Sequence, residues 1–173
     1  DTTYPVSEKA WRKGGSKMFV RLGEEIAIND LMRGIIIQSG NDACIVFAEG
    51  FAGSEERLAQ RMTEKALELG MQDTTFKNAT GWPDEAHVTS ARDLAILAER
   101  TIKDFPQYYP IYAERSYVYN GITQQNRNML LGRNIGVDGL KTGHTEAAGY
   151  GITISGEQDG RRVHVVVGGL DSE

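Results

Sequence analysis

The sequence predicts an α+β fold in which a helical region packs on an antiparallel sheet. Helical patterns occupy the chain from about residue 29 to 112, and β-prone segments separated by turn residues occupy about 115 to 170. Helices that come first and strands that come last favour α+β over an alternating α/β sheet. No linker rich in Pro, Gly or Ser divides the chain, so residues 1–173 are expected to form a single domain.

The first two helical segments are short and mostly apolar. Residues 29–38 form the first, with Asn29 or Asp30 as the expected N-cap. The pattern stops at residues 39–41, where Gly interrupts it, and helical character resumes over 42–51. The sequence therefore predicts a tight connection between two apolar helices.

Two later helices carry clear start and stop signals. Ser54 is the expected N-cap of an amphipathic helix that ends at Gly70, a residue type common just after helix ends. Ser90 and Asp93 have the spacing of a capping box at the start of the next helix. The turn-rich segment 73–87 between these helices is expected to be a loop with a short extended piece.

The last third of the chain has the pattern of strands. Asn120–Gly121 lies between β-prone residues and predicts a hairpin turn. Three further strands, which form an antiparallel meander, are expected at 137–145, 149–156 and 161–169. The last strand carries apolar residues on one face, namely Val163, Val165 and Val167. A sheet that buries this face needs another element packed on it, so we expect the domain to be incomplete.

Composition excludes several classes of function. The net charge of −5 and the pI near 5.3 argue against a nucleic-acid-binding protein, which would carry a basic stripe. No apolar run approaches the roughly 20 residues that span a bilayer, and no signal peptide is recognisable. Cys44 is the single cysteine and is expected in the core. The three histidines lack metal-ligand spacing, so neither a metal nor another cofactor is expected.

The stretch "LKTGHT" (140–145) carries the strongest chemical signal. A phosphate-binding loop would need Gly directly before Lys141 and Gly five positions earlier, but Leu140 and Ile135 occupy these places. In a strand, Gly143 would let a ligand lie close to the backbone. At a sheet edge, the free N–H groups could hold a peptide or an oxyanion. A solvated strand lysine remains the alternative.

A second candidate is "QSGNDA", which presents the Ser39 hydroxyl and the Asn41 amide between two apolar helices. A turn in which one of these residues caps the next helix is the alternative. Ser39 lies 102 positions before Lys141. Only the fold can bring these two residues together.

Taken together, "IIIQSGNDACIVFAEG" and "VDGLKTGHTEAAGYGITIS" closely resemble the low-molecular-mass penicillin-binding proteins that act as serine-type D-alanyl-D-alanine carboxypeptidases. "ALELGMQDTTFKNATGW", "TSARDLAIL" and "NGITQQNRNMLLG" match the same family in the same order. The resemblance covers nearly the whole chain. It implies a DD-peptidase fold, shared more widely with the serine β-lactamases, and a Ser-x-x-Lys, Ser-x-Asn and Lys-Thr-Gly motif set.

One motif of that set is missing. No serine of the sequence is followed three positions later by lysine. In the family, the nucleophilic Ser and its Lys partner precede the Ser-x-Asn motif. We therefore expect the chain to be a piece of the enzyme that lacks its front, and to be inactive alone.

The resemblance assigns catalytic roles to three residues. Ser39 relays a proton toward the leaving amine, and Lys141 holds Ser39 and favours the neutral form of the family's motif lysine. Asn41 hydrogen-bonds the peptide group of the substrate.

Four further residues are implied in substrate binding beside Lys141. Thr142 and Arg127 hold the terminal carboxylate, which suits an Arg fork. Gly143 belongs to the same edge, and the backbone N–H of His144 forms half of the oxyanion hole. A surface salt bridge is the alternative role for Arg127, and the His144 side chain has no assigned role.

The expected partners are peptidoglycan stem peptides that end in D-Ala-D-Ala, and β-lactam antibiotics. This substrate implies a periplasmic or otherwise extracytoplasmic location, with a membrane anchor possible in the full protein. The alternatives are a DD-endopeptidase and a non-catalytic peptidoglycan-binding scaffold. A class A β-lactamase is disfavoured, because residues 70–90 contain no Glu-x-x-x-Asn; Glu85 is followed at that spacing by Thr89.

Overall fold

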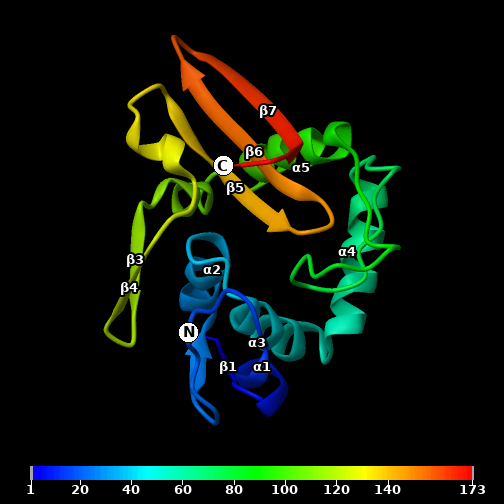
Figure 1. The fold of residues 1–173 in the computed structure, drawn as a ribbon, viewed down its shortest axis with the longest axis vertical. Coiled ribbons are helices and arrows are strands. Elements are labelled where there is room, and N and C mark those ends of the chain that lie inside the picture. Colours follow the sequence, from blue (N-terminus) through cyan, green and yellow to red (C-terminus); the bar gives the residue numbers. More distant parts are fainter. Residues whose placement is uncertain (1, 173) are drawn as a thin grey trace.

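The computed structural model describes residues 2–172 and shows helices followed by strands, as predicted (Figure 1). The helices are α1 (Glu8–Arg12), α2 (Ile28–Ile36), α3 (Asn41–Ala52), α4 (Glu55–Glu68) and α5 (Ala91–Asp104). Two short 3₁₀ helices follow, η1 (Tyr109–Ala113) and η2 (Met129–Gly132). None of the helices within residues 2–172 is both long and apolar enough to span a bilayer.

Three small antiparallel sheets contain the strands. They are β1 (Thr3–Pro5) with β2 (Glu25–Ala27), β3 (Ser116–Tyr119) with β4 (Ile122–Gln125), and β5 (Val137–Thr145), β6 (Gly149–Gln158) and β7 (Arg161–Leu170). The β3–β4 hairpin turns at Asn120–Gly121, and the last three strands form the predicted meander. Strand β1 and helix α1 were not predicted.

The position of β5 in the last sheet determines the site. The strand order is β5-β6-β7, so β5 is an edge strand within the described chain. Helix α5 packs against β6 and β7, while α2 and α3 lie beyond the free edge of β5 (Figure 1). An edge strand leaves alternate N–H and C=O groups unpaired, and here they point toward the helical half.

Two capping predictions for the early helices are wrong. The N-cap of α2 is Ala27, without a side-chain capping bond, and Asp30 accepts a hydrogen bond of 2.6 Å from the Tyr117 hydroxyl. Helix α3 begins after Gly40, so neither Ser39 nor Asn41 is its cap. Tertiary contacts have replaced local capping at both helix starts.

The capping predictions for α4 and α5 are confirmed in part. Ser54 accepts from the backbone N–H of Arg57 at 3.2 Å, and Ser90 from that of Asp93 at 3.2 Å. The Asp93 carboxylate, however, accepts from the Asp73 N–H and the Thr74 hydroxyl, at 2.8 and 2.7 Å. Asp93 therefore fixes the loop after α4, a long-range role that capping-box spacing does not predict.

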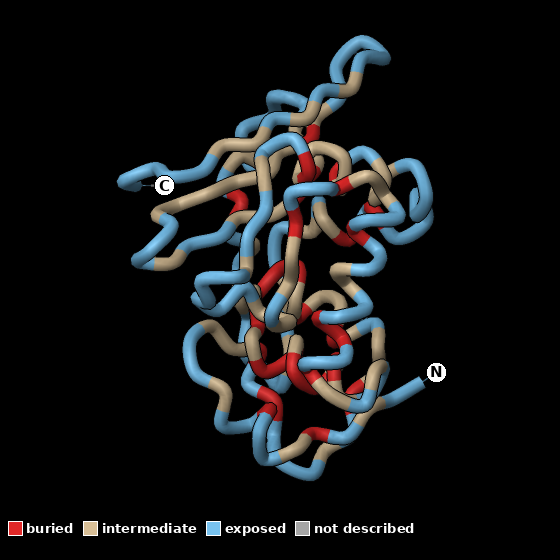
Figure 2. Tube along the Cα trace, turned by 90° about the vertical axis from the view of Figure 1, so that its right-hand side faces the viewer, coloured by how far each residue is buried: buried red, intermediate tan, exposed pale blue. Residues whose placement is uncertain are grey.

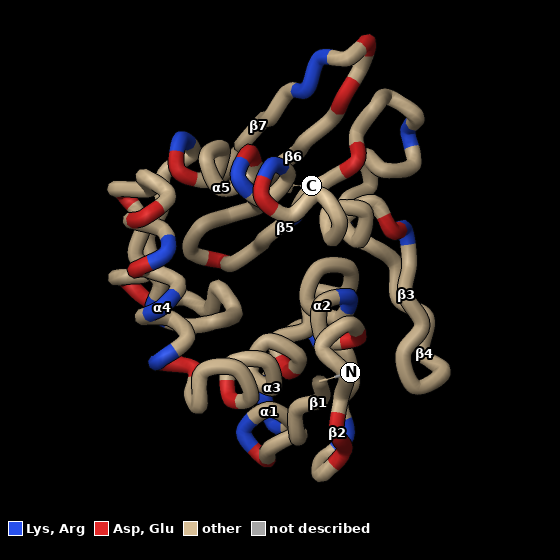
Figure 3. The backbone as a smooth tube through the Cα atoms, turned by 180° about the vertical axis from the view of Figure 1, so that it is seen from behind, with Lys and Arg blue, Asp and Glu red and all other residues tan. Residues whose placement is uncertain are grey.

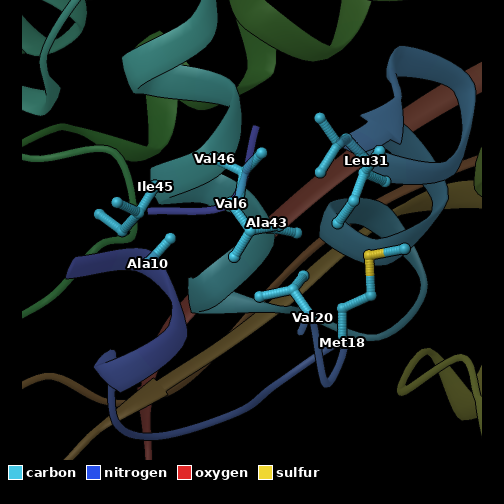
Figure 4. Packing of buried hydrophobic residues seen from close by; sticks show 9 residues of the cluster. Val6, Ala10, Met18, Val20, Leu31, Ala43, Ile45 and Val46 are labelled. Atoms are coloured by element: carbon cyan, nitrogen blue, oxygen red, sulfur yellow. The ribbon is translucent and has the colours of Figure 1, made fainter. Parts of the chain in front are cut away.

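The best-buried core surrounds α2 and α3. Figure 4 shows its side chains, and Figure 2 shows the buried segments concentrated in that half of the molecule. The members are Val6, Ala10, Met18, Val20, Ile26, Leu31, Ala43, Ile45 and Val46. The last sheet is more open: Val163 and Val165 are 56% and 44% exposed, so within the described residues these valines have no complete cover, the need for which the sequence had indicated.

Candidate active site

The turn between α2 and α3 forms the first wall of the site. Ser39 adopts a left-handed conformation with φ of 53°, which is uncommon for serine and is often found at functional sites. The next residue, Gly40, has to be small: a Cβ atom there would lie only 2.9 Å from both the Met18 nitrogen and the Asp42 carboxylate. The turn therefore holds the Ser39 hydroxyl in a fixed position at the start of α3.

Strand β5 forms the opposite wall and brings Lys141 to Ser39. The Nζ atom of Lys141 donates hydrogen bonds to Ser39 Oγ and, at 3.0 Å, to the Thr142 carbonyl. The fold thus joins two residues 102 positions apart. Lys141 is not a solvated strand residue, because its ammonium lies in the space between the two walls.

Burial changes the acidity of Lys141. Loss of solvation, together with a smaller effect of the nearby positive charge of Arg127, lowers the pKa of Lys141 to about 8. Near neutral pH this lysine can therefore change protonation state at little cost. Such a perturbed pKa is typical of groups at functional sites.

A third wall comes from residues 14–16, which sequence reasoning missed. The side-chain amide of Asn41 donates to the Gly14 carbonyl at 3.0 Å, and its backbone N–H to the Ser16 carbonyl at 2.8 Å. Arg127 Nη2 donates to Ser16 Oγ at 2.8 Å. Residues 14–16 therefore connect Asn41 with Arg127.

The three walls enclose an open cleft of about 1180 Å³, somewhat above the usual range for ligand sites. Every predicted site residue lines it: Ser39, Asn41, Arg127, Lys141, Thr142, Gly143 and His144. Among residues 2–172, no carboxylate pairs with Arg127, which argues against the salt-bridge alternative. The cleft therefore offers two cations to an anionic ligand.

The imidazole of His144 stacks on the Tyr150 ring of β6, with centroids 3.9 Å apart. This contact uses the side chain to brace the strand pair. It leaves the backbone of Gly143 and His144 at the edge of the cleft, where both residues are exposed. This exposure leaves room for a ligand to lie against the main chain at Gly143.

Sequence reasoning also missed Asp42. Its buried carboxylate accepts hydrogen bonds from the backbone N–H groups of Met18, Phe19, Val20 and Ala43, at 2.8 to 3.1 Å. These bonds attach the segment that follows residues 14–16 to the start of α3. The sequence does show an acidic residue in the first turn of a helix. Such a residue is normally interpreted as a favourable interaction with the dipole of its own helix, and not as a bond to a distant segment.

Cys44 also differs from its prediction as a core residue. It is only partly buried and lines the cleft. Burial nevertheless raises the pKa of the thiol to about 12. Because a thiol with this pKa is not ionised near neutral pH, Cys44 is not an activated nucleophile.

Comparisons with known proteins agree with this geometry. A family model described as "D-alanyl-D-alanine carboxypeptidase" (peptidase S11) matches residues 1–172. The chain belongs to this family. Two carboxypeptidases of Escherichia coli K12 resemble it: DacD is 41% identical over 179 residues and DacC is 42% identical over 171. The matches cover 99% and 94% of this chain, and 46% and 43% of DacD and DacC, respectively.

Solved structures of carboxypeptidase-family proteins have the same fold. DacD from Francisella tularensis superposes with a TM-score of 0.97 at 32% identity, covering 99% of this chain and 54% of that one. Penicillin-binding protein 6B from E. coli gives 0.93 at 41% identity, covering 99% and 56%. The chain therefore spans about half the length of these carboxypeptidase relatives.

Proposed function

We propose that the protein containing this chain is a serine-type D-alanyl-D-alanine carboxypeptidase. It removes the terminal D-Ala from peptidoglycan stem peptides through an acyl-serine and is acylated by β-lactams. The hydrogen bond between Lys141 and Ser39, inside a cleft that also contains Arg127, is the observation that carries the proposal.

The Ser39–Lys141 pair supplies proton transfer. The Ser39 hydroxyl can donate a proton to the leaving amine while it is held and polarised by Lys141. Since the pKa of Lys141 is near 8, its charge also disfavours the protonated form of a neighbouring lysine. A neutral lysine is the base that a serine nucleophile needs.

Substrate binding uses the rest of the cleft. The Arg127 guanidinium and the Thr142 hydroxyl hold the terminal carboxylate, while the Asn41 amide bonds the preceding peptide group. The backbone N–H of His144 faces the carbonyl that becomes an oxyanion, where one such donor is worth about 3 kcal/mol. The exposed Gly143 backbone allows the substrate to lie against β5.

The nucleophile and its lysine are not part of this sequence, since no Ser-x-x-Lys is present. The 173-residue chain is therefore inactive by itself, and the activity belongs to a longer protein. Its substrate, a component of the cell wall, places the reaction outside the cytoplasm.

The experiment compares the 173-residue chain with the full-length protein. Each is incubated with a fluorescent penicillin, denatured and separated, and D-Ala release from an acyl-D-Ala-D-Ala peptide is measured in parallel. We expect a covalent adduct and D-Ala release from the full-length protein alone. An adduct on the short chain, or neither activity in the full-length protein, would contradict the proposal.

A further inference from the structure

The loop that joins α4 to α5 forms one side of the cleft (Figure 1). Residues 79–83 of this loop line the cleft, and the Trp82 ring packs against the segment 14–16. A Cβ atom on Gly15 would lie 3.2 Å from this ring and 2.6 Å from Asn41 Nδ2, so Gly15 lies between the two side chains. A displacement of the loop can therefore reach Asn41 through a single glycine.

The two ends of this loop are joined by a short antiparallel bridge. Thr75 and Val88 exchange two backbone hydrogen bonds, of 2.9 and 3.0 Å. Next to them, the backbone N–H of Lys77 donates to Nδ1 of His87 at 3.2 Å. The backbone N–H of His87 in turn donates to the Asp84 carbonyl at 3.0 Å. The His87 side chain thus adds one bond to the bridge, on the side of the residues that line the cleft.

The His87 ring is held by its surroundings. It packs edge-on against the Phe76 ring, with centroids 5.5 Å apart. The backbone N–H of Phe76 donates to Thr63 Oγ1 on α4 at 2.9 Å, which fixes that ring in turn. Within residues 81–89 of the described chain, His87 is the one residue that is not exposed. The imidazole is therefore packed as a structural part of the loop.

The bond from Lys77 requires one protonation state of His87. Nδ1 can accept a hydrogen bond only when it carries no proton, so the imidazole must be neutral with its proton on Nε2. Protonation of Nδ1 would place two N–H donors against each other. Burial lowers the pKa of His87 below the ordinary 6.5, against the opposite effect of the Asp84 carboxylate. The bond is therefore intact above about pH 6.5 and is lost as the pH falls through the pKa of His87.

Asp84, on the same loop, is the charged side chain that acts on His87 within the described chain. Helix α4 contributes the uncharged Thr63 hydroxyl beside the Phe76 backbone. Toward α5, the Asp93 carboxylate already accepts a hydrogen bond of 2.7 Å from the Thr74 hydroxyl. The titration of His87 therefore depends on its burial and on Asp84.

We propose that neutral His87 is a positioning residue that holds residues 79–83 beside Gly15 and thereby keeps Asn41 aligned for the substrate. Protonation of His87 breaks the bond from Lys77, loosens the loop and lowers kcat/KM on the acidic side. This inference deepens the proposed function and rests on it, since Asn41 acts in that reaction.

The test measures kcat/KM of the full-length protein for an acyl-D-Ala-D-Ala peptide from about pH 8 to about pH 5, and circular dichroism verifies folding at each pH. His87→Asn keeps an acceptor oxygen near the Nδ1 position and cannot be protonated, whereas His87→Leu has no acceptor. On acidification, the wild type should lose about 5-fold more of its kcat/KM than His87→Asn, the effect of a hydrogen bond worth about 1 kcal/mol. At neutral pH, His87→Leu should already show this loss. Titrations of other groups are common to all three proteins and cancel in the comparison.

Asp84→Asn tests the titration without a change at His87. The carboxylate raises the pKa of His87, and asparagine keeps the oxygen that accepts from the Ala86 N–H at 2.8 Å. This variant should move the acid loss to lower pH. Asp159→Asn, in the β6–β7 turn outside the cleft, is the matched control and should leave the loss unchanged. Long-range ¹H–¹⁵N NMR spectra should show the Nε2–H tautomer of His87, with the midpoint of the loss in kcat/KM.

Three results would overturn the inference alone. They are a proton on Nδ1 of His87 at neutral pH, an acid loss in His87→Asn as large as in the wild type, and a midpoint that Asp84→Asn does not move. Absence of D-Ala release at every pH would overturn the proposed function and the inference with it.

Discussion

The buried Asp42 carboxylate accepts a hydrogen bond of 2.8 Å from the backbone N–H of Met18, 24 positions earlier. Together with the bonds from Phe19 and Val20, it attaches one side of the cleft to the helix that follows Ser39. The position of Asn41 and the path of residues 14–16 therefore depend on a carboxylate that does not line the cleft.

Asp42→Asn should destabilise the chain by about 2–4 kcal/mol. The variant places an amide donor against backbone N–H donors in a buried site, which leaves charge-assisted hydrogen bonds unmade. Urea unfolding followed by circular dichroism measures the change. Asp104→Asn, which removes a surface pair with Arg100, is the control and should cost less than about 1 kcal/mol. Equal losses in the two variants would contradict the role of Asp42.

Gly15→Ala tests the contact between residues 14–16 and Asn41. Gly15 has φ of +77°, and a Cβ there would lie 2.6 Å from Asn41 Nδ2. Gly23 has φ of +79° with no atom near its Cβ position, so Gly23→Ala measures the backbone strain alone. We expect about 1 kcal/mol of destabilisation in Gly23→Ala and a larger loss in Gly15→Ala. In the full-length protein, only Gly15→Ala should slow acylation by penicillin.

Lys141 should titrate with a midpoint near pH 8 in ¹³C NMR spectra of the Lys side chains. Because the folded pKa lies below the ordinary value of 10.5, the protonated lysine disfavours the folded state. The contribution of Lys141 to the free energy of unfolding is therefore least favourable below pH 8 and improves up to about 10.5. Arg127→Gln should raise the midpoint, whereas Arg161→Gln at the start of β7 should not. A midpoint near 10.5 in the wild type would contradict the buried geometry.

Asp138 joins β5 to β7 through Arg162, with two hydrogen bonds of 2.8 Å. Burial acts to raise the pKa of Asp138, but the hydrogen bonds from Arg162 and Tyr109 outweigh it, so the pKa lies below its usual 3.8. Asp138→Asn should cost about 1–2 kcal/mol at pH 7. Since the wild-type carboxylate becomes protonated in acid, the difference should shrink as the pH falls below about 3.8. A difference independent of pH would contradict the ion pair.

The sequence predicted those parts of the fold that local patterns determine. Ser54, Ser90 and Gly70 marked helix ends correctly, because their side-chain or backbone chemistry acts within one turn. The prediction that Asn29 or Asp30 caps α2 failed although both are common capping residue types, because Asp30 accepts a hydrogen bond from Tyr117 instead. Long-range contacts are not visible in local patterns.

In the candidate site, too, some residues could be predicted from the sequence and others could not. The resemblance named Ser39, Asn41, Lys141 and Arg127, which the fold brings to one cleft. It did not predict the role of Asp42, which depends on hydrogen bonds from distant backbone N–H groups. The alternation of valines in the last strand indicated a face that needs a cover, and Val163 and Val165 are exposed in the described chain; the pattern alone does not show what covers them.

The most direct test of the central claim is a double-mutant cycle on Ser39 and Lys141 in the full-length protein. Acylation rates with a labelled penicillin are measured for the wild type, Ser39→Ala, Lys141→Ala and the double variant. If the two side chains act as one unit, each single change should slow acylation at least about 100-fold and the double change should add little. Independent, multiplying losses, or single variants that react as fast as the wild type, would contradict a shared catalytic role.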